Sequence, residues 1–410
     1  MLVAAALALG GAAGKSGTLG TAGTTAGTAG TEAPLCSLMG RGHVYFGGVC
    51  AICGAAEPGE ESRYFNFVTL ADGTYAVGAG GEEHLPAELI LPSEYYGIAV
   101  THVLAGGFAG CDEIERVVIS ENVKTVGAAA FENCKNLKSA AFEGSELRTV
   151  EARAFYGCES LASVCLPQGL RTLGISAFGL CSALESIDMP AGLLYIGGSC
   201  FKGCASLESV VLPQGLRSIS NNAFEDCTAL AELSIPASVT SIGTAVFDGC
   251  GDINVTAEEG GNYASAGGCL IDKEYKTVIF GTGKSEIPAD GSVNNVGVYA
   301  FCNRKDLTSI VLPAEVTQIS QYAFAACVNL ETAELCGVVT IGAGAFIQCE
   351  SLESIVLPAS VQSIHKGALD DCRSLTSIIY GGTVEQWHAI EKYDLRGAVT
   401  VYCTDGEIIL

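Results

Sequence analysis

Basic residues are scarce in this chain. Its 410 residues include 21 lysines and arginines against 45 aspartates and glutamates, which gives a formal net charge of −24. Nucleic acids and anionic membrane surfaces attract clustered lysine and arginine, so this charge balance argues against both as partners. The chain also lacks an uninterrupted apolar run of about 18 to 20 residues, so we expect no transmembrane segment.

Residues that form catalytic motifs are scarce as well. The five histidines lie in no recognisable catalytic pattern, and the many carboxylates are scattered along the chain. Gly283, Lys284 and Ser285 imitate the end of a phosphate-binding loop, but Val278 stands where the first glycine of that motif belongs. These observations argue against an enzyme, and we nominate no catalytic residue.

Large apolar residues, in contrast, recur at regular intervals. They are spaced by 22 to 24 residues, except for one step of 54 between Phe247 and Phe301. The recurring positions are Phe108, Phe131, Phe155, Phe178, Phe201, Phe224, Phe247, Phe301, Phe324, Phe346 and Leu369. A fixed period of this size is typical of a solenoid, in which each repeat forms one coil and packs on its neighbours. The spacing predicts about 11 coils of about 23 residues.

One unit, from Leu207 to Cys227, shows the pattern as LESVVLPQGLRSISNNAFEDC. Alternating apolar residues at its start predict a short strand with one buried face, and Pro213 ends that strand because proline donates no ladder hydrogen bond. About six buried apolar side chains contribute roughly 2 to 3 kcal/mol each, against about 1.5 kcal/mol for ordering each residue. A single unit therefore does not fold alone, and stacking must supply the remaining contacts.

Ten of the 19 cysteines form a column, each three residues after the large residue of a repeat. They are Cys111, Cys134, Cys158, Cys181, Cys204, Cys227, Cys250, Cys327, Cys349 and Cys372, and Arg304 stands where an eleventh belongs. Aligned side chains fit the dihedral angle of a disulfide poorly. We therefore expect buried free thiols that help to satisfy backbone groups of the turns.

The repeat, nearly intact in IPASVTSIGTAVFDGC from Ile235 to Cys250, resembles the BspA-like, or treponemal-type, leucine-rich repeat family. The match runs from about residue 99 to residue 410, and NYASAGGCLIDKEYKTVIF from Asn262 to Phe280 resembles the hairpin that this family inserts between coils. The resemblance implies an α/β fold dominated by β-structure, namely a right-handed solenoid with a parallel sheet on one face and one β-hairpin insertion.

Composition and the resemblance together suggest how the chain is divided. We expect a signal peptide at 1–14, a Gly/Thr/Ala linker at 15–34, a small Cys/His module at 35–60, an N-terminal lead-in and cap at 61–98, the solenoid at 99–380 with its insertion at 254–286, and a C-terminal cap at 381–410. The apolar start resembles a secretory signal, but its basic region is missing, and a low-complexity segment is the alternative.

Four soft ligands precede the solenoid. Cys36, His43, Cys50 and Cys53 are spaced as C-x6-H-x6-C-x2-C, which fits one tetrahedral zinc ion held entirely by protein ligands. We expect a structural zinc site there, with a disulfide or a redox pair between Cys50 and Cys53 as the alternatives. The chain requires no other cofactor.

Outward positions of the predicted strands form two columns that we expect to bind a partner. The candidate binding residues are Arg116, Val118, Ser186, Asp188, Ser209, Val211, Glu232, Ser234, Ser309, Val311, Thr332, Glu334, Ser354 and Val356. Exposed β-branched residues interrupted by carboxylates are typical of a contact surface. In the alternative interpretation the small hydroxyls only stack along the sheet.

The family resemblance implies a secreted or cell-surface bacterial protein that acts in protein binding or adhesion. Its partners would be extracellular or host-surface proteins, and the strand face would be the binding surface. The runner-up is a surface spacer without a specific ligand, and an enzyme with an unrecognised site comes third. A fold supports many functions, so the repeat itself names no ligand.

Overall fold

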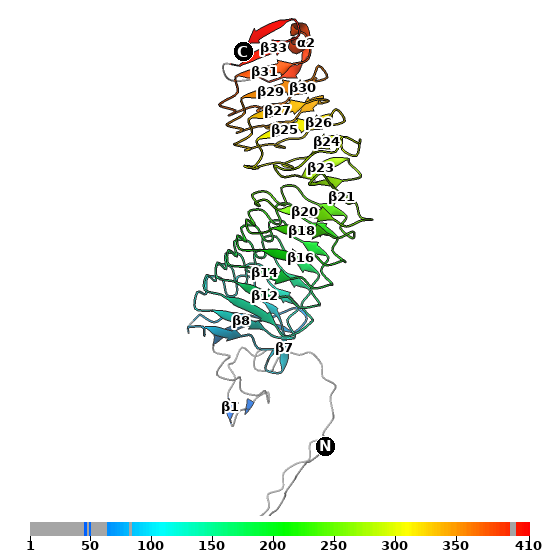
Figure 1. The fold of residues 1–410 in the computed structure, drawn as a ribbon. Coiled ribbons are helices and arrows are strands. Elements are labelled where there is room, and N and C mark those ends of the chain that lie inside the picture. Colours follow the sequence, from blue (N-terminus) through cyan, green and yellow to red (C-terminus); the bar gives the residue numbers. More distant parts are fainter. Residues whose placement is uncertain (1–44, 47–48, 51–63, 82–83, 394–398) are drawn as a thin grey trace, which may run out of the picture.

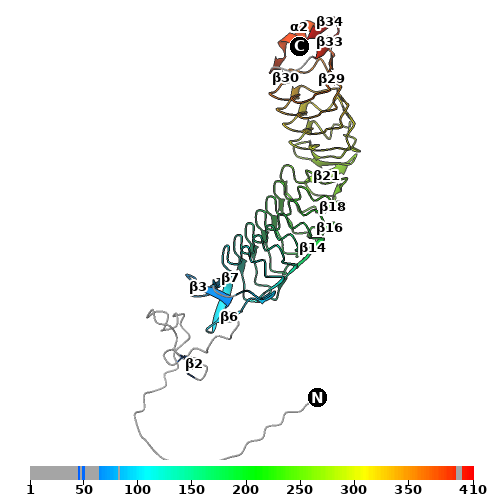
Figure 2. The same cartoon turned by 90° about the vertical axis from the view of Figure 1, so that its left-hand side faces the viewer.

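A computed structural model of the protein describes residues 45–46, 49–50, 64–81, 84–393 and 399–410. Within these ranges, coils of parallel strands stack into a long curved rod (Figures 1 and 2). The β-dominated solenoid predicted from the repeat is confirmed. No helix in this part of the chain is long and apolar enough to cross a membrane.

The first parallel sheet contains the strand that opens each coil, and we call its outward surface the strand face. Its first part contains β5 (Glu88–Ile90), β8 (Arg116–Ile119), β10 (Ser139–Phe142), β12 (Ser163–Cys165), β14 (Ser186–Asp188), β16 (Ser209–Val211), β18 (Glu232–Ile235) and β20 (Asn254–Ala257). Its second part contains β25 (Ser309–Leu312), β27 (Thr332–Leu335), β29 (Ser354–Leu357), β31 (Ser377–Tyr380) and β33 (Thr400–Cys403), and β34 (Gly406–Ile409) adds to its edge as an antiparallel partner of β33. Neighbouring coils align the same repeat position, as where Ser186 pairs with Ser209.

Strands of two residues form a second parallel sheet, which the sequence analysis did not predict. They are β9 (Thr125–Val126), β11 (Thr149–Val150), β13 (Thr172–Leu173), β15 (Tyr195–Ile196), β17 (Ser218–Ile219), β19 (Ser241–Ile242), β24 (Asn295–Val296), β26 (Gln318–Ile319), β28 (Thr340–Ile341), β30 (Ser363–Ile364) and β32 (Glu391–Lys392). Most of them bury their second residue, as in Ile219 of β17, whereas Ile242 of β19 and Lys392 of β32 are half-buried. The coil therefore has two ladders of backbone hydrogen bonds rather than a sheet on one face only.

The large residues of the repeat stack through the interior. From Phe108 to Phe247 the ring centroids lie 5.1 to 6.1 Å apart, with planes within 11° of parallel. The turns around these rings place residues other than glycine in the left-handed region, such as Arg153 with φ of 59°. This conformation costs energy and persists because the next coil holds the turn, as where Phe131 N–H donates to the carbonyl of Ala154 at 2.7 Å.

The cysteine column makes the contacts that the sequence predicts. From Cys134 onward, each thiol of the column donates to the carbonyl of the repeat phenylalanine in the preceding coil, for example Cys204 Sγ to Phe178 O at 3.2 Å and Cys250 Sγ to Phe224 O at 3.0 Å. Burial raises the pKa of the Cys204 thiol to about 12, so the thiol keeps its proton at neutral pH and can donate it. The column therefore joins coils by hydrogen bonds and packing.

We expect Cys204→Ser to lower the free energy of unfolding by about 1 to 3 kcal/mol, because a shorter and more polar hydroxyl is poorly satisfied at this buried position. Urea denaturation followed by circular dichroism measures the effect. Cys165→Ser is the matched control, because that cysteine is exposed on the strand face. Equal midpoints for the two variants would show that the column thiol does not stabilise the coil.

The long step in the repeat contains a three-stranded antiparallel meander rather than the expected hairpin. It consists of β21 (Tyr263–Ala266), β22 (Cys269–Asp272) and β23 (Thr277–Phe280), and β23 continues into the second sheet through β24. The expected insertion boundary at residue 254 is corrected as well. β20 pairs in parallel with β18 and belongs to a coil, because Ile253 and Val255 supply the same buried alternation as other strands.

The meander divides the apolar interior into two cores. Leu270 packs in the first core and its neighbour Ile271 in the second. Phe280 fills the interior beyond Phe247, with ring centroids 5.2 Å apart at 68°. The rod is therefore two blocks of regular coils joined through one irregular segment (Figure 1).

Both ends of the rod are closed. An antiparallel hairpin of β3 (Phe65–Thr69) and β4 (Tyr75–Ala79) joins β7 (Ile98–Val103) at the first coil, and β6 (Glu94–Tyr95) pairs with β7. A separate short pair is formed by β1 (Tyr45–Phe46) and β2 (Val49–Cys50). At the other end, α2 (Val384–Ala389) places Trp387 fully buried against Tyr380. The lone tryptophan thus covers the last coils, as an end coil requires.

Candidate functional site

The strand face presents most of the predicted binding residues to solvent. Two large apolar side chains on this face are widely exposed, Val211 at 80% and Val311 at 60%. The exposed candidates are Arg116, Ser186, Asp188, Ser209, Val211, Glu232, Ser234, Ser309, Val311, Thr332 and Glu334, whereas Ser354 and Val356 are half-buried. The parallel register brings residues from many coils onto this one surface.

Val118 is the exception among these candidates, because it is only 8% exposed. It occupies the same outward strand position as Asp188 and Val211, but the N-terminal lead-in runs beside this end of the sheet. Leu91 N–H donates to the carbonyl of Val118 at 2.9 Å, and Ser120 donates to the carbonyl of Pro92 at 3.1 Å. Its prediction as an exposed contact residue is therefore wrong.

A hollow of about 330 Å³ opens in the strand face over β16, β18 and β20. The sheet register is interrupted there, since β16 and β18 pair only at Ser209 and Glu232, whereas β18 and β20 pair at four positions. Val211 and Leu233 contribute apolar surface to the hollow, and Glu232 and Glu258 contribute carboxylates. At its rim, Gln214 donates to Glu258 across the intervening coil at 2.8 Å.

Three residues that line the hollow are not among the contact residues predicted from sequence. They are Asn254, Thr256 and Glu258, which fall within the expected insertion at 254–286. The signal was present in INVTA from Ile253, which alternates inward and outward residues as the other strands do. The missing proline after this strand concealed the match.

Charge is distributed unevenly along the face. At the N-terminal end, Arg116 pairs with Glu88 at 3.5 Å and Lys138 pairs with Glu115 at 2.7 Å. From β14 to β31, by contrast, the strands of the strand face and the residues directly before them contain carboxylates but neither lysine nor arginine. The carboxylates on this part of the face are Glu185, Asp188, Glu208, Glu232, Glu331, Glu334 and Glu353.

Arg304 joins the two blocks of coils at the position of the missing column cysteine. Its guanidinium is buried, donating from Nη2 to Phe247 O at 2.8 Å and from Nη1 to Cys250 O at 3.0 Å, and it lies 4.7 Å from the ring centroid of Phe280. Because Phe280 occupies the space before Phe301, only a long side chain reaches the carbonyl of Phe247. Arg304 thus replaces the thiol of a regular coil.

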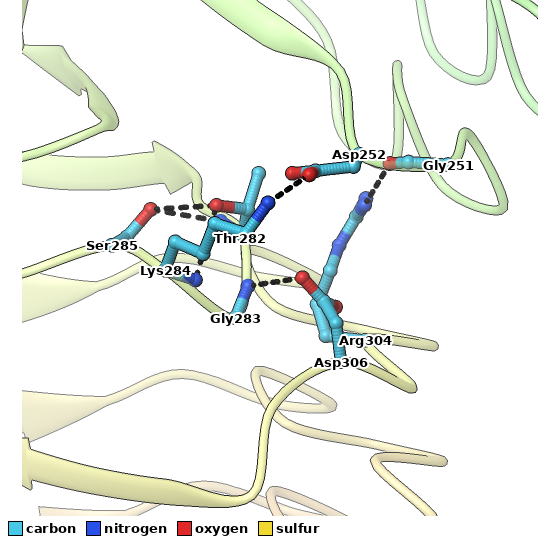
Figure 3. Close-up of polar contacts among 8 residues, drawn as sticks. All are labelled: Gly251, Asp252, Thr282, Gly283, Lys284, Ser285, Arg304 and Asp306. Atoms are coloured by element: carbon cyan, nitrogen blue, oxygen red, sulfur yellow. Dashed lines mark hydrogen bonds and ion pairs between the residues drawn. The ribbon is translucent and has the colours of Figure 1, made fainter.

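The segment that imitates a phosphate-binding loop lies at the same junction (Figure 3). Lys284 forms an ion pair with Asp252, and Gly283 N–H donates to the carboxylate of Asp306 at 2.9 Å. Ser285 accepts from the backbone N–H of Thr282 at 2.8 Å. The lysine and backbone donor that would hold a phosphate are engaged by carboxylates, and the next element is β24 rather than a helix.

Other predicted chemistry has no described site. Cys36, His43 and Cys53 lie outside the described residues, and only the backbone of Cys50 is placed, in β2. The zinc site therefore remains a prediction.

A cavity of about 490 Å³ beside Arg304 is lined by Asp226, Asp252 and Asp306 as well, so positive and negative side chains meet there. Across the described ranges no cluster of three or more metal-ligating side chains is assembled.

The stacked parallel coils, the phenylalanine and cysteine columns and the open strand face define a leucine-rich repeat solenoid. The model of the BspA type leucine-rich repeat region matches residues 101–230, 136–256 and 281–390. The chain belongs to this family.

Solved bacterial structures share the fold. A leucine-rich cell surface protein from Faecalibacterium prausnitzii is 26% identical with a TM-score of 0.64, covering 81% of this chain and 97% of that one. The pneumococcal vaccine antigen PcpA is 20% identical with a TM-score of 0.57, and the match covers 83% of this chain and 91% of that one. A leucine-rich repeat protein from Bacteroides ovatus is 21% identical with a TM-score of 0.55, and the match covers 83% of this chain and 89% of that one. No curated protein sequence matches the chain.

Proposed function

We propose that the protein is a secreted or cell-surface bacterial binding module whose strand face contacts extracellular or host-surface proteins. The observation that carries this proposal is that the large apolar residues Val211, Val311 and Ile379 are left exposed on the strand face. Such residues increase affinity only when a partner covers them. The printed description of the similar Faecalibacterium protein as a cell surface protein supports the location.

If the protein binds its partner through this face, charged residues introduced there should strongly lower its affinity. We expect the combined variant Val211→Lys, Val311→Lys, Val356→Lys to weaken binding of a captured extracellular protein by about 100-fold or more, because it buries charge and removes apolar contact. Surface plasmon resonance measures the affinity, and circular dichroism checks that the variant is folded. The partner is first isolated by capture with the full chain from extracellular extracts.

A matched variant places the same three charges on the second sheet. Ser241→Lys, Gln318→Lys and Gln362→Lys replace exposed residues of that side. We expect it to bind like the unmodified protein. Normal binding by the strand-face variant would refute the assignment of the contact surface to the strand face. A spacer would bind no partner saturably and would tolerate both sets of changes.

A further inference from the structure

Carboxylates on the strand face lie unpaired beside one another. Glu208 N–H donates to the carbonyl of Glu185 at 3.0 Å, and Glu353 N–H donates to that of Glu331 at 2.9 Å, so each pair occupies the same position on adjacent coils. Like charges at neighbouring sheet positions repel each other. Among the described residues, no ion pair involves a strand-face carboxylate from β14 to β31.

The turns of the same coils are arranged differently. There, glutamates meet basic residues of adjacent coils, as where Lys202 pairs with Glu225 at 2.8 Å. Arg373 pairs with Glu350 at 3.7 Å in the second block. The turns thus neutralise neighbouring carboxylates, whereas the strand face leaves the repulsion between its carboxylates unrelieved.

The hollow over β16, β18 and β20 combines these carboxylates with apolar surface. Val211 is 80% exposed at its wall, and Glu232 and Glu258 lie within its lining. A lysine or arginine side chain has both matching parts, since its methylene stem packs on apolar surface while its charged head binds carboxylate. An acidic partner would add to the repulsion instead.

We propose that the strand face from β14 to β31 binds a protein segment in which basic residues alternate with aliphatic residues, and that the hollow receives one of the basic side chains. This proposal rests on the proposed function and names the chemistry of its partner. Aliphatic residues of the segment cover Val211, Val311 and Ile379, while its basic residues relieve the repulsion between the stacked glutamates. The field of the acidic face also speeds encounter with such a segment.

Synthetic peptides of about ten residues, long enough to span several coils, provide the test. The first alternates arginine with valine, the second replaces valine with serine, and the third replaces arginine with glutamate. Isothermal titration calorimetry measures binding of each peptide to the full chain. Salt at about 0.15 M screens the attraction between distant charges, so binding that depends only on such charges is suppressed. We expect saturable binding of the first peptide, binding weaker by about tenfold for the second, and none for the third.

Two variants of equal net charge separate the face from the charge of the whole molecule. Glu185→Gln, Glu208→Gln and Glu232→Gln change the strand face. Glu274→Gln, Glu286→Gln and Glu315→Gln change exposed positions outside its strands. We expect the first set to weaken binding of the arginine–valine peptide by about tenfold and the second by less than about twofold, because exposed charge pairs act over short distances in salt.

Equal weakening by the two sets would overturn the proposal, because it would assign binding to the overall acidity. Failure of the arginine–valine peptide to bind, or equal binding of the arginine–serine peptide, would overturn it as well. The proposed function is judged separately, by loss of a captured extracellular protein in the valine-to-lysine variant. If the valine-to-lysine variant no longer binds the captured protein, but the unmodified chain does not bind the basic peptides, the strand face is still the binding surface. Only the proposed chemistry of its partner would then be refuted.

Discussion

Arg304→Ala is expected to separate the unfolding of the rod into two transitions. The substitution removes the buried hydrogen bonds from Arg304 to Phe247 O and Cys250 O. Hydrogen bonds to a charged group contribute about 1.5 to 3 kcal/mol each, and the loss falls on the interface between two cores. We expect the coupling between the blocks to fall by about 3 to 5 kcal/mol, since lost partners leave carbonyls poorly satisfied.

The lone tryptophan makes this experiment direct. Trp387 is buried in the second core, so its fluorescence follows that block, whereas far-ultraviolet circular dichroism follows the whole rod. In a solenoid, stability is a sum of coil and interface terms, and a weakened interface lets the blocks unfold separately. The two signals should coincide in urea for the unmodified protein and diverge in the variant.

Two further substitutions act as controls. We expect Arg304→Cys to behave like Arg304→Ala although it restores the residue of a regular repeat, because a thiol does not span the space that Phe280 fills. Arg304→Lys should retain part of the coupling, because its ammonium keeps a charged donor on a long stem. Coincident transitions with unchanged midpoints in all three variants would show that the meander alone joins the blocks.

Phe224→Ala is expected to lower the free energy of unfolding of the first block by about 3 to 5 kcal/mol, because it removes a large side chain from a close-packed interior. Phe224 is fully buried and stacks on Phe201 at 5.4 Å and on Phe247 at 6.1 Å. Urea denaturation followed by circular dichroism measures the loss, while Trp387 fluorescence shows whether it spreads to the second block.

Phe224→Leu is the matched variant, because the chain itself has leucine at the equivalent position in the last repeat. Leu369 is buried there with 8% exposure. We expect this change to cost about 1 to 2 kcal/mol, since leucine retains much of the apolar volume. If the alanine variant loses no more stability than the leucine variant, the ring column is not the main support of the coil.

Regular coils were predictable from sequence because every one repeats the same environment. The thiol of Cys227 contacts the carbonyl of Phe201 as that of Cys204 contacts Phe178, so one unit predicts the next. The outward columns follow from the alternation of each strand. Burial of Val118 did not follow, because the lead-in beside it does not belong to the repeat.

Departures from the repeat were visible in the sequence, but their consequences were not. Arg304 was recognised as a missing cysteine, yet its acceptor Phe247 lies 57 residues earlier and is brought near only by the meander. The break in pairing between β16 and β18, which opens the hollow, has no sequence signal that we recognise.

The sequence by itself determined the period, the stacked interior, the thiol column and the outward columns of the strand face, because these depend on contacts between identical neighbours. Only the tertiary structure decided the second sheet, the three-stranded meander and the joint at Arg304. It also decided where the carboxylates of the strand face remain unpaired. These features depend on backbone register and on contacts between segments that share no repeat position, and such contacts have no period to reveal them.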